Sequence, residues 1–428
     1  MRIEDAANLE DIRKMAKRRL PRLAYDFIEG GVEGEYCLAR NRDAFQRYTI
    51  VPRYLVDVSE RDQSTTLFGR KYASPFGISP AGVAGLFWPD ADRLLAEEAA
   101  AANIPFVMSA ASSLRIEDAA KLAPKTTWFQ VYGTRDSRIM DDQVRRARDS
   151  GISTLVLTID VPIVPRRERN IRNGFSRPLR MTPGRLLQGL SHPSWLIGYL
   201  RSGGVPLLAN WTSYLPDGAS RDDIADLFGA NTPASGQEWS ALERIRSLWP
   251  RHLVVKGILH PQDAKRAMEA GVDGIIVSNH GGRQADCTPS PLDMIRPIRA
   301  AVGDDLTLML DSGIRRGTDV LVARCLGAQF AFFARPTLYG AAAAGAKGIR
   351  KAIEIVRTEI DLALAQLGCP RLSSLGAEFL TEHVLHAADE KPVAKKAGQK
   401  ARIGLRNVQC LESMEEAVRP PYDRLAES

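Results

Sequence analysis

Short apolar runs alternate with helix-like stretches along most of this chain, and this alternation constrains its fold more than any other feature. Eight strand-like runs occur between residues 75 and 345 of the 428, and stretches of helical periodicity separate most of them. The strand-like runs are Phe76–Pro80, Pro105–Ser109, Trp128–Val131, Thr154–Asp160, Leu253–Lys256, Gly274–Ser278, Thr307–Asp311 and Phe330–Ala334. The helix-like stretches include Asp90–Asn103, Ile116–Leu122, Ser137–Ser150, Gln262–Ala270 and Gly317–Cys325. Eight such units predict an α/β fold, a parallel (β/α)8 TIM barrel.

The same pattern divides the chain. Residues 1–60 predict an N-terminal helical cap, residues 61–385 the barrel, and residues 386–428, which contain a stretch rich in Ala and Lys, a flexible C-terminal tail. Residues 161–235 interrupt the alternation after the fourth strand with no clear helix of the barrel type, and an inserted loop of this length is usually functional or disordered. The alternative fold is a doubly wound open sheet, which eight repeats without a GxGxxG turn after the first strand disfavour.

Composition limits the classes of protein to consider. The hydrophobic content of 44% and the charged content of 25% are ordinary for a globular core, and no apolar run is long enough to predict a transmembrane helix. Five scattered cysteines without a CxxC pair, and an N-terminus without a secretory pattern, predict a cytoplasmic protein with neither a disulfide framework nor a metal site. The net charge of +7 leaves open an anionic ligand, an acidic membrane or nucleic acid.

Residues 277–284 read Val-Ser-Asn-His-Gly-Gly-Arg-Gln and continue a buried strand-like run. His280 titrates near neutrality and can accept a proton. Arg283 carries a planar guanidinium that matches a carboxylate, and the two glycines let backbone approach a flat or charged group. A lone histidine on a loop is usually structural, but a proton acceptor beside a carboxylate-binding cation indicates chemistry at the carbon next to a carboxylate.

Other polar residues stand where strand-like runs end, which is where the chemistry of TIM barrels collects. Asp160 is a candidate to accept a hydrogen bond from His280 and to stabilise its protonated form. One of Arg166 and Arg167 is a candidate for a second carboxylate ligand. Lys256 needs a partner, because an unpaired buried ammonium is costly, and an electron-rich ring would serve. The remaining strand-end candidates are Ser109, Gln130, Tyr132, Thr158, Ser278, Asp311 and Arg335.

The loops after the last two strands have the composition of a phosphate site. Residues 310–317 read Leu-Asp-Ser-Gly-Ile-Arg-Arg-Gly, and residues 333–336 read Phe-Ala-Arg-Pro. In TIM barrels these loops commonly bind phosphate through backbone N–H groups and a helix N-terminus. Arg315 and Arg335 add positive charge, although an arginine at a helix start is more often solvated.

Together these motifs resemble the FMN-dependent 2-hydroxy-acid dehydrogenase and oxidase family, which includes glycolate oxidase, lactate dehydrogenases and mandelate dehydrogenase. The resemblance covers about residues 20–380 and rests on residues 157–168, 277–284 and 311–317. It implies FMN as the cofactor, oxidation of an (S)-2-hydroxy acid to the 2-oxo acid and, by analogy alone, a homotetramer. The implied roles are His280 as the catalytic base with Asp160 as its support, Arg167 and Arg283 as the substrate-carboxylate ligands, and Tyr25 and Tyr132 as the two active-site tyrosines.

The resemblance also implies where FMN lies. Its reactive N5 side would face Pro80, Ala81 and Gly82. Its ring and ribityl parts would contact Ser109, Gln130, Thr158, Lys256 and Ser278, and its phosphate end Asp311, Gly313, Arg315, Ala334 and Arg335. Lys256 would stabilise the reduced, anionic ring, and carbanion and hydride mechanisms both stay open. Ala334 is a departure, since family members usually have glycine there, and its methyl group would loosen FMN slightly.

Side-chain size near the substrate's 2-substituent bears on the size of the substrate. Gly82 and Ala111 are small at positions where small-substrate oxidases carry bulkier groups, which favours a long-chain or aromatic 2-hydroxy acid. The alternative is that these small residues merely pack there. Residues 337–340 and 366–370 look most like those of mandelate dehydrogenase and of membrane lactate dehydrogenases, which favours the larger substrate.

The inserted segment bears on the electron acceptor. Between Glu168 and Asp217 it has no acidic residue but six arginines, Arg169, Arg172, Arg177, Arg180, Arg185 and Arg201. Interleaved with them are the apolar groups 186–187, 195–200, 205–208 and Trp211. This mixture predicts that the segment, about residues 169–215, lies on the anionic inner face of the cell membrane. The electrons of the reaction would then go to a membrane quinone rather than to oxygen. The alternative is a segment folded onto the barrel or a neighbouring subunit. Nucleic acid is disfavoured, because the basic residues form no polar stripe.

Two other functions stay open from the sequence. One is a soluble oxidase that passes electrons to oxygen and makes hydrogen peroxide. The other is a flavin-binding protein without turnover that acts as an interaction module, which the joint presence of His280, Arg283, Arg167 and Asp160 disfavours.

Overall fold

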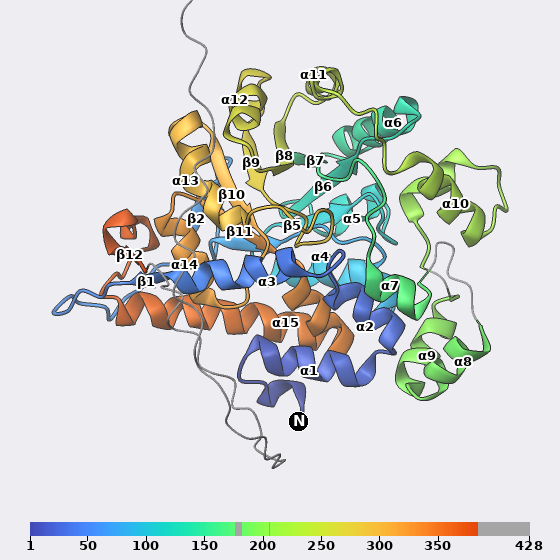
Figure 1. Cartoon of the computed structure of the whole chain (residues 1–428), viewed down its shortest axis with the longest axis horizontal. Coiled ribbons are helices and arrows are strands. Elements are labelled where there is room, and N and C mark those ends of the chain that lie inside the picture. Colours follow the sequence, from blue (N-terminus) through green and yellow to red (C-terminus); the bar gives the residue numbers. More distant parts are fainter. Residues whose placement is uncertain (176–181, 205, 384–428) are drawn as a thin grey trace, which may run out of the picture. The chain divides into compact units, whose positions relative to one another are not determined.

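Eight parallel strands form a closed barrel in the computed structural model, which describes residues 1–175, 182–204 and 206–383 (Figure 1). The strands are β4 (Phe76–Ile78), β5 (Phe106–Ser109), β6 (Thr127–Tyr132), β7 (Thr154–Thr158), β8 (His252–Ile258), β9 (Gly274–Val277), β10 (Thr307–Asp311) and β11 (Phe330–Phe333). Each pairs with the next along the chain, and β11 pairs with β4 to close the barrel. The predicted TIM barrel is confirmed, and each predicted run overlaps one strand.

Helices surround this barrel and connect its strands. They are α4 (Ala91–Ala101), α5 (Ile116–Leu122), α6 (Ser137–Asp149), α11 (Trp239–Leu248), α12 (Pro261–Glu269), α13 (Pro291–Val302), α14 (Gly317–Cys325) and α15 (Arg335–Gln366). Local sequence explains where α6 begins: the Asp136 side chain caps it by accepting a hydrogen bond from the backbone N–H of Arg138. Along α6 the buried positions, which include Ile139, Val144 and Ala147, recur at helical spacing and face the barrel.

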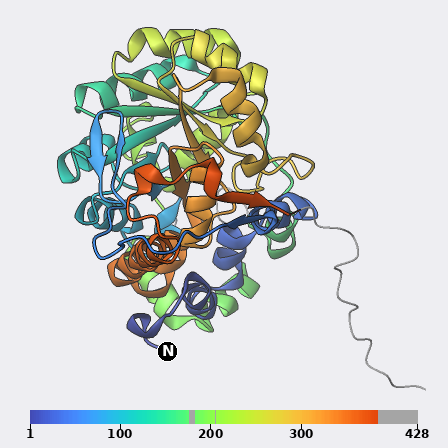
Figure 2. The ribbon, with the colours of Figure 1, turned by 90° about the vertical axis from the view of Figure 1, so that its left-hand side faces the viewer.

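Large apolar side chains fill the end of the barrel where the strands begin. They include Val107, Trp128, Val156, Val254, Ile276, Met309, Phe330 and Phe332. The hairpin of β2 (Thr65–Leu67) and β3 (Arg70–Tyr72) covers this end (Figure 2), and its Phe68 stacks on His252, the first residue of β8. Space for a ligand is therefore left at the opposite end, where the strands finish.

Three helices precede the barrel: α1 (Leu9–Arg19), α2 (Arg22–Glu29) and α3 (Tyr36–Asp43). Helix α1 packs along α15, as both views show (Figures 1 and 2). Strand β1 (Tyr48–Ile50) pairs antiparallel with β12 (Leu380–Glu382), so the segment that follows α3 meets the end of the described chain in one small sheet. The predicted tail, 386–428, lies outside the described residues.

The inserted segment between β7 and α11 contains helices rather than only a long loop. They are α7 (Glu168–Asn173), α8 (Pro183–Leu190), α9 (Pro193–Arg201) and α10 (Arg221–Asn231). Arg177, Arg180 and Val205, and the side chains of Arg185 and Leu186, lie outside what the structure describes. Among the described residues, no helix combines the length and the apolar character needed to cross a membrane.

Two tryptophans that the sequence placed on a membrane surface are buried against the barrel instead. Trp195 donates a hydrogen bond from Nε1 to the Leu86 carbonyl at 2.8 Å, and Trp211 donates to the Ala110 carbonyl at 3.1 Å. A buried indole N–H needs an acceptor, and the loops of the barrel supply one to each ring. The alternative expectation, a segment folded onto the barrel, is therefore correct for these residues.

Candidate active site

A cavity of about 770 Å³ opens where the barrel strands end. Most predicted site residues lie on its wall: Pro80, Ala81, Gly82, Tyr132, Arg167, Lys256, His280, Arg283, Asp311, Gly313, Arg315, Ala334 and Arg335. The buried strand-end residues Ser109, Gln130, Thr158 and Ser278, with Asp160, lie beside or beneath these wall residues, as strand pairing and hydrogen bonds show. The structure therefore brings together residues at the ends of all eight barrel strands, which are far apart in the sequence.

His280 and Asp160 form a hydrogen-bonded pair at this wall. His280 has a φ of 59°, which is uncommon for a residue other than glycine, and positions of this kind cluster at functional sites. Its Nδ1 lies 2.9 Å from Asp160 Oδ1. Burial lowers the pKa of His280 below its ordinary value of 6.5, although Asp160 acts to raise it. The imidazole is therefore uncharged at neutral pH, and Nε2 is the nitrogen left to accept a proton.

A β-bulge in β8 makes room for Asp160. The register of β8 against β9 shifts between Lys256 and Ile258, and the residue between them, Gly257, has a φ of 113°. A Cβ atom at position 257 would lie 2.6 Å from the Cβ of Asp160, too close for any side chain. Gly257 therefore permits both the bulge and the close approach of Asp160 to this strand.

Lys256, Ser278 and Asp311 form a buried ionic network at the ends of β8, β9 and β10. Lys256 Nζ lies 2.9 Å from both Ser278 Oγ and Asp311 Oδ2, and the hydroxyls of Ser278 and Ser79 each donate to Asp311 at 2.9 Å. Burial acts to lower the pKa of Lys256 and to raise that of Asp311, but their attraction outweighs burial in both cases. The pKa of Lys256 is therefore raised and that of Asp311 lowered, and a charged ammonium stands at the cavity wall.

Two buried polar groups of β6 and β7, near this network, have no hydrogen-bond partner within the described parts of the chain. They are Gln130 Nε2 and Thr158 Oγ1. Ser109 Oγ donates to the other end of the Gln130 amide, Oε1, at 3.1 Å, which leaves Nε2 unmatched. A buried group without a partner costs about 1–3 kcal/mol, so a ligand is expected to bond to both. A flat ring with polar edges, such as that of FMN, fits an amide N–H, a hydroxyl and an ammonium arranged in this way.

The cavity is also suited to a phosphate at its far end. Arg315 and Arg335 both line it, after β10 and β11. Gly313 has a φ of 86°, and any side chain there would collide with the Asn41 carbonyl. Arg335 organises the surrounding backbone by donating hydrogen bonds of 2.8–3.0 Å to the carbonyls of Ile28, Gly30 and Gly281. Two guanidinium groups beside closely approaching backbone are what an anionic phosphate requires.

Arg167 and Arg283 meet on the side of the cavity near His280. Arg167 directly precedes α7, and its Nε donates to the Arg283 carbonyl at 3.3 Å. The Arg283 guanidinium donates to the Gly30 carbonyl at 2.7 Å and lies 5.0 Å from the centre of the Phe27 ring, within the range of a cation–π contact. The pair is suited to a carboxylate. Arg166, the alternative considered from the sequence, is exposed and is absent from the wall.

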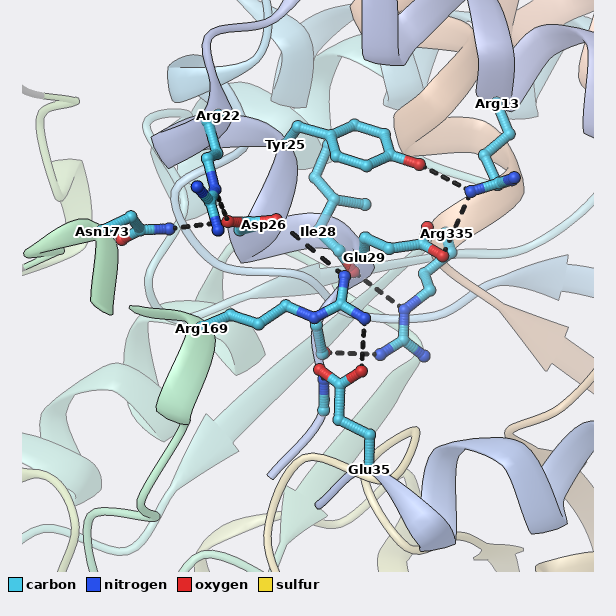
Figure 3. A network of polar contacts seen from close by, with 12 residues as sticks. Arg13, Arg22, Tyr25, Asp26, Ile28, Glu29, Glu35, Arg169, Asn173 and Arg335 are labelled. Carbon is cyan, nitrogen blue, oxygen red and sulfur yellow. Dashed lines mark hydrogen bonds and ion pairs between the residues drawn. The ribbon is translucent and has the colours of Figure 1, made fainter. Parts of the chain in front are cut away.

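The predicted placement of Tyr25 at the active site is wrong. Its ring is 6% exposed, and its hydroxyl accepts a hydrogen bond from Arg13 at 2.8 Å (Figure 3). Phe27, two residues further along α2, lines the cavity instead. Residues two apart on an α-helix point about 200° apart, so only one of them can face the cavity. Among the described residues, Tyr132 is the one tyrosine on its wall.

The outer wall of the cavity was not found from the sequence. It includes Asn170, Ile171 and Phe175 at α7, and Phe228 of α10. One signal was available: the inserted segment follows a barrel strand directly, so its first residues must lie where the strands end. The helical spacing of Phe228 from Ile224, which is also buried, would have indicated an inward face of α10.

Relatives of known function agree with this geometry. Residues 16–382 match the model of the FMN-dependent dehydrogenase family. The chain is 41% identical over 373 residues to (S)-mandelate dehydrogenase of Pseudomonas putida, which covers 87% of this chain and 93% of that protein. It is 37% identical over 377 residues to an L-lactate dehydrogenase of Caulobacter vibrioides, which covers 88% of this chain and 98% of that protein.

Among solved structures, the monotopic membrane protein (S)-mandelate dehydrogenase superposes with a TM-score of 0.84 at 40% identity, over 89% of this chain and 100% of that one. The family match covers nearly all of the described residues, including every barrel strand and every residue that lines the cavity. The chain therefore belongs to the FMN-dependent dehydrogenase family, as an enzyme that oxidises 2-hydroxy acids with FMN as its cofactor.

Proposed function

We propose that this enzyme oxidises a bulky (S)-2-hydroxy acid to the 2-oxo acid, with His280 as the catalytic base. The observation that carries the proposal is an uncharged imidazole, held 2.9 Å from Asp160, on the same cavity wall as two guanidinium groups. A base and a carboxylate site side by side favour proton removal at or next to the 2-carbon of a hydroxy acid.

The proposed mechanism assigns a task to each of these residues. Arg167 and Arg283 bind the substrate carboxylate and so fix the position of the 2-carbon. His280 Nε2 takes a proton from the substrate, and Asp160 stabilises the imidazolium that forms. Tyr132 is proposed to hydrogen-bond to the substrate from β6. FMN, when bound, would supply the acceptor for the two electrons and for the second hydrogen that the substrate loses.

The residues proposed to hold FMN come from the ends of most barrel strands. Lys256 favours negative charge on the ring, because a fixed ammonium in a buried site stabilises charge that develops next to it. The unmatched groups of Gln130 and Thr158 support this placement. The complete proposed set is Pro80, Ala81, Gly82, Ser109, Gln130, Thr158, Lys256, Ser278, Asp311, Gly313, Arg315, Ala334 and Arg335.

A large substituent on the 2-carbon is supported by the shape of the cavity. Gly82 and Ala111 both line it, and a Cβ atom at position 82 would come within 3.0 Å of the Ala111 side chain. Small side chains at both positions therefore keep space open. Phe27, Phe175 and Phe228 line the same cavity and provide apolar surface for an aromatic ring. An aromatic 2-hydroxy acid such as mandelate is the proposed substrate.

Helices α8 and α9 are proposed to lie on an anionic membrane surface. They pack against each other, and they expose four apolar side chains, each 49–69% accessible: Leu187, Leu190, Ile197 and Leu200. Arg201, at the end of α9, is also exposed. Apolar side chains beside a cation match the interface of an anionic bilayer. One relative of known structure is described as a monotopic membrane protein.

A membrane quinone is the proposed electron acceptor. Ile163, Val164 and Ile171 line the cavity and are 59–76% exposed, so its wall continues into apolar surface. An apolar acceptor gains free energy by contact with such a surface, whereas oxygen does not need it. These residues follow β7 in the same inserted segment as α8 and α9.

The homotetramer that the family resemblance implies stays a prediction.

Substitutions on α8 and α9 test the membrane proposal. Leu190→Glu combined with Leu200→Glu is expected to move the protein from the membrane pellet to the supernatant after centrifugation. Flavin reduction by substrate should stay unchanged, because neither leucine lines the cavity. Leu362→Glu, at a position 57% exposed on α15, is the matched control and should stay in the pellet. A double variant that still pellets would contradict the proposal, and rapid peroxide formation in air would indicate oxygen as the acceptor.

A further inference from the structure

Polar side chains outside the cavity join α2 and the segment after it to α7 (Figure 3). Asp26 is 7% exposed and accepts a hydrogen bond from Asn173 Nδ2 at 3.1 Å. Glu35 forms an ion pair with Arg169, and Arg169 also lies 3.9 Å from Asp26. A buried carboxylate needs such partners, because an unpaired charge is costly away from water. Two acidic side chains of the N-terminal region therefore hold two side chains of α7.

Helix α7 depends on contacts of this kind for its position. It has six residues, whereas an isolated helix needs roughly 12–15 to be even marginally stable in water. On another of its faces Ile171 is 59% exposed, and Arg172 is exposed as well. Arg167 is the N-cap residue of this helix, directly before its first residue. A displacement of α7 would therefore displace Arg167.

The other side of these contacts is anchored to the barrel. Glu29, on α2, accepts a hydrogen bond from the hydroxyl of Tyr339 on α15 and lies 3.4 Å from Arg13 on α1. Arg335 donates to the Ile28 carbonyl at 2.8 Å. Figure 3 shows the contact of Glu29 with Arg13 and that of Arg335 with Ile28 on the side of α2 away from Asn173. Helix α2 is thus a fixed support against which α7 is held.

We propose that Asp26 and Glu35 are positioning residues for substrate-carboxylate binding: through Asn173 and Arg169 they hold α7 so that Arg167 points into the cavity. This inference rests on the proposed role of Arg167. Neither acidic residue lines the cavity, so each acts through α7. A guanidinium binds a carboxylate in a fixed planar geometry, so a misplaced α7 weakens substrate binding more than it slows the later proton transfer.

Arg169→Met and Arg172→Met in the FMN-bound enzyme form a matched pair. Both positions are on α7, but Arg172 pairs with Glu168 within that helix. Arg169→Met is expected to raise the KM for (S)-mandelate about tenfold, and likewise the Kd of benzoate, measured from the perturbation of flavin absorbance. The limiting rate of flavin reduction should change less than about twofold. Arg172→Met should match the wild type in all three quantities.

Two further measurements separate positioning from general damage. Arg169→Lys keeps the charge that pairs with Glu35 and should recover most of the affinity. Mandelamide, which has no carboxylate, should bind equally to wild type and Arg169→Met. If Arg169→Met folds poorly, Asn173→Ala removes the other contact and should give the same pattern. The proposal is overturned if Arg169→Met raises the Kd of benzoate no more than Arg172→Met does. It is also overturned if Arg169→Met weakens the binding of mandelamide as much as that of benzoate.

Arg167→Met distinguishes failure of this inference from failure of the proposed function. It should weaken benzoate binding at least as much as Arg169→Met does. Weaker binding in Arg167→Met with normal binding in Arg169→Met would refute only the positioning role. Normal benzoate binding in Arg167→Met would refute the carboxylate site itself, and the positioning role with it.

Discussion

His280→Gln is expected to remove reduction of the bound flavin by 2-hydroxy acids while leaving FMN in place. Glutamine can still donate a hydrogen bond to Asp160, which lies 2.9 Å from the imidazole, but it cannot take up a proton. Loss of a general base typically costs about 10²–10⁴ in rate. Anaerobic stopped-flow absorbance measures the reduction rate, and the visible spectrum of the purified variant reports its FMN content.

The pH dependence of the wild type tests the same assignment. The base acts only when uncharged, and burial holds the pKa of His280 below 6.5. The kcat/KM for reduction should therefore fall to half of its plateau value only at a pH below 6.5. His280→Gln should lack this acid limb. An acid limb with its midpoint above pH 6.5, or a variant as fast as wild type, would contradict the role of His280.

Lys256→Met is expected to destabilise the fold and to weaken FMN binding at once. The substitution leaves the carboxylate of Asp311, which is 8% exposed, without the ammonium now 2.9 Å away. Removing one partner of a buried ion pair costs about 3–5 kcal/mol, because the other charge is left uncompensated. The Tm of the purified protein measures the first effect, and fluorescence titration of the apoprotein with FMN measures the second.

A double variant separates these two effects. In Lys256→Met with Asp311→Asn no charge remains in the network, and the amide oxygen can still accept a hydrogen bond from Ser79 or Ser278. Most of the lost stability should return. Flavin reduction should not, since the cation beside the ring is still absent. A single variant with the Tm of the wild type would show that Lys256 and Asp311 are not coupled as their 2.9 Å contact indicates.

Much of the fold could be predicted because its signals are local. Each barrel strand is a short apolar run, and such runs are recognisable without knowledge of their neighbours. Closure into a barrel then brings the strand ends together, which is why Lys256, His280 and Asp311 converge as predicted. The inserted segment was less predictable, because its helices are short and depend on the barrel: Trp195 and Trp211 are buried among apolar side chains of other segments, and loops of the barrel provide the carbonyls that accept their hydrogen bonds.

Contacts between distant segments account for the errors at the site. Tyr25 and Phe27 are both aromatic, and only the orientation of α2 on the barrel decides that Phe27 lines the cavity. That orientation depends on Glu29 and Tyr339, which are 310 residues apart. The ion pair of Glu35 with Arg169 also joins segments that are far apart in the sequence, the N-terminal region and the inserted segment. No local pattern encodes such pairs.

Anaerobic reduction of the bound flavin by (S)-mandelate is the most direct test of the proposed function. The fully loaded enzyme should lose its flavin absorbance when (S)-mandelate is added and should recover it slowly in air but rapidly with a soluble quinone. The same experiment with glycolate should give little bleaching, because the cavity favours a bulky substituent. Flavin that (S)-mandelate leaves oxidised, or that glycolate bleaches and air rapidly restores, would contradict a large-substrate dehydrogenase.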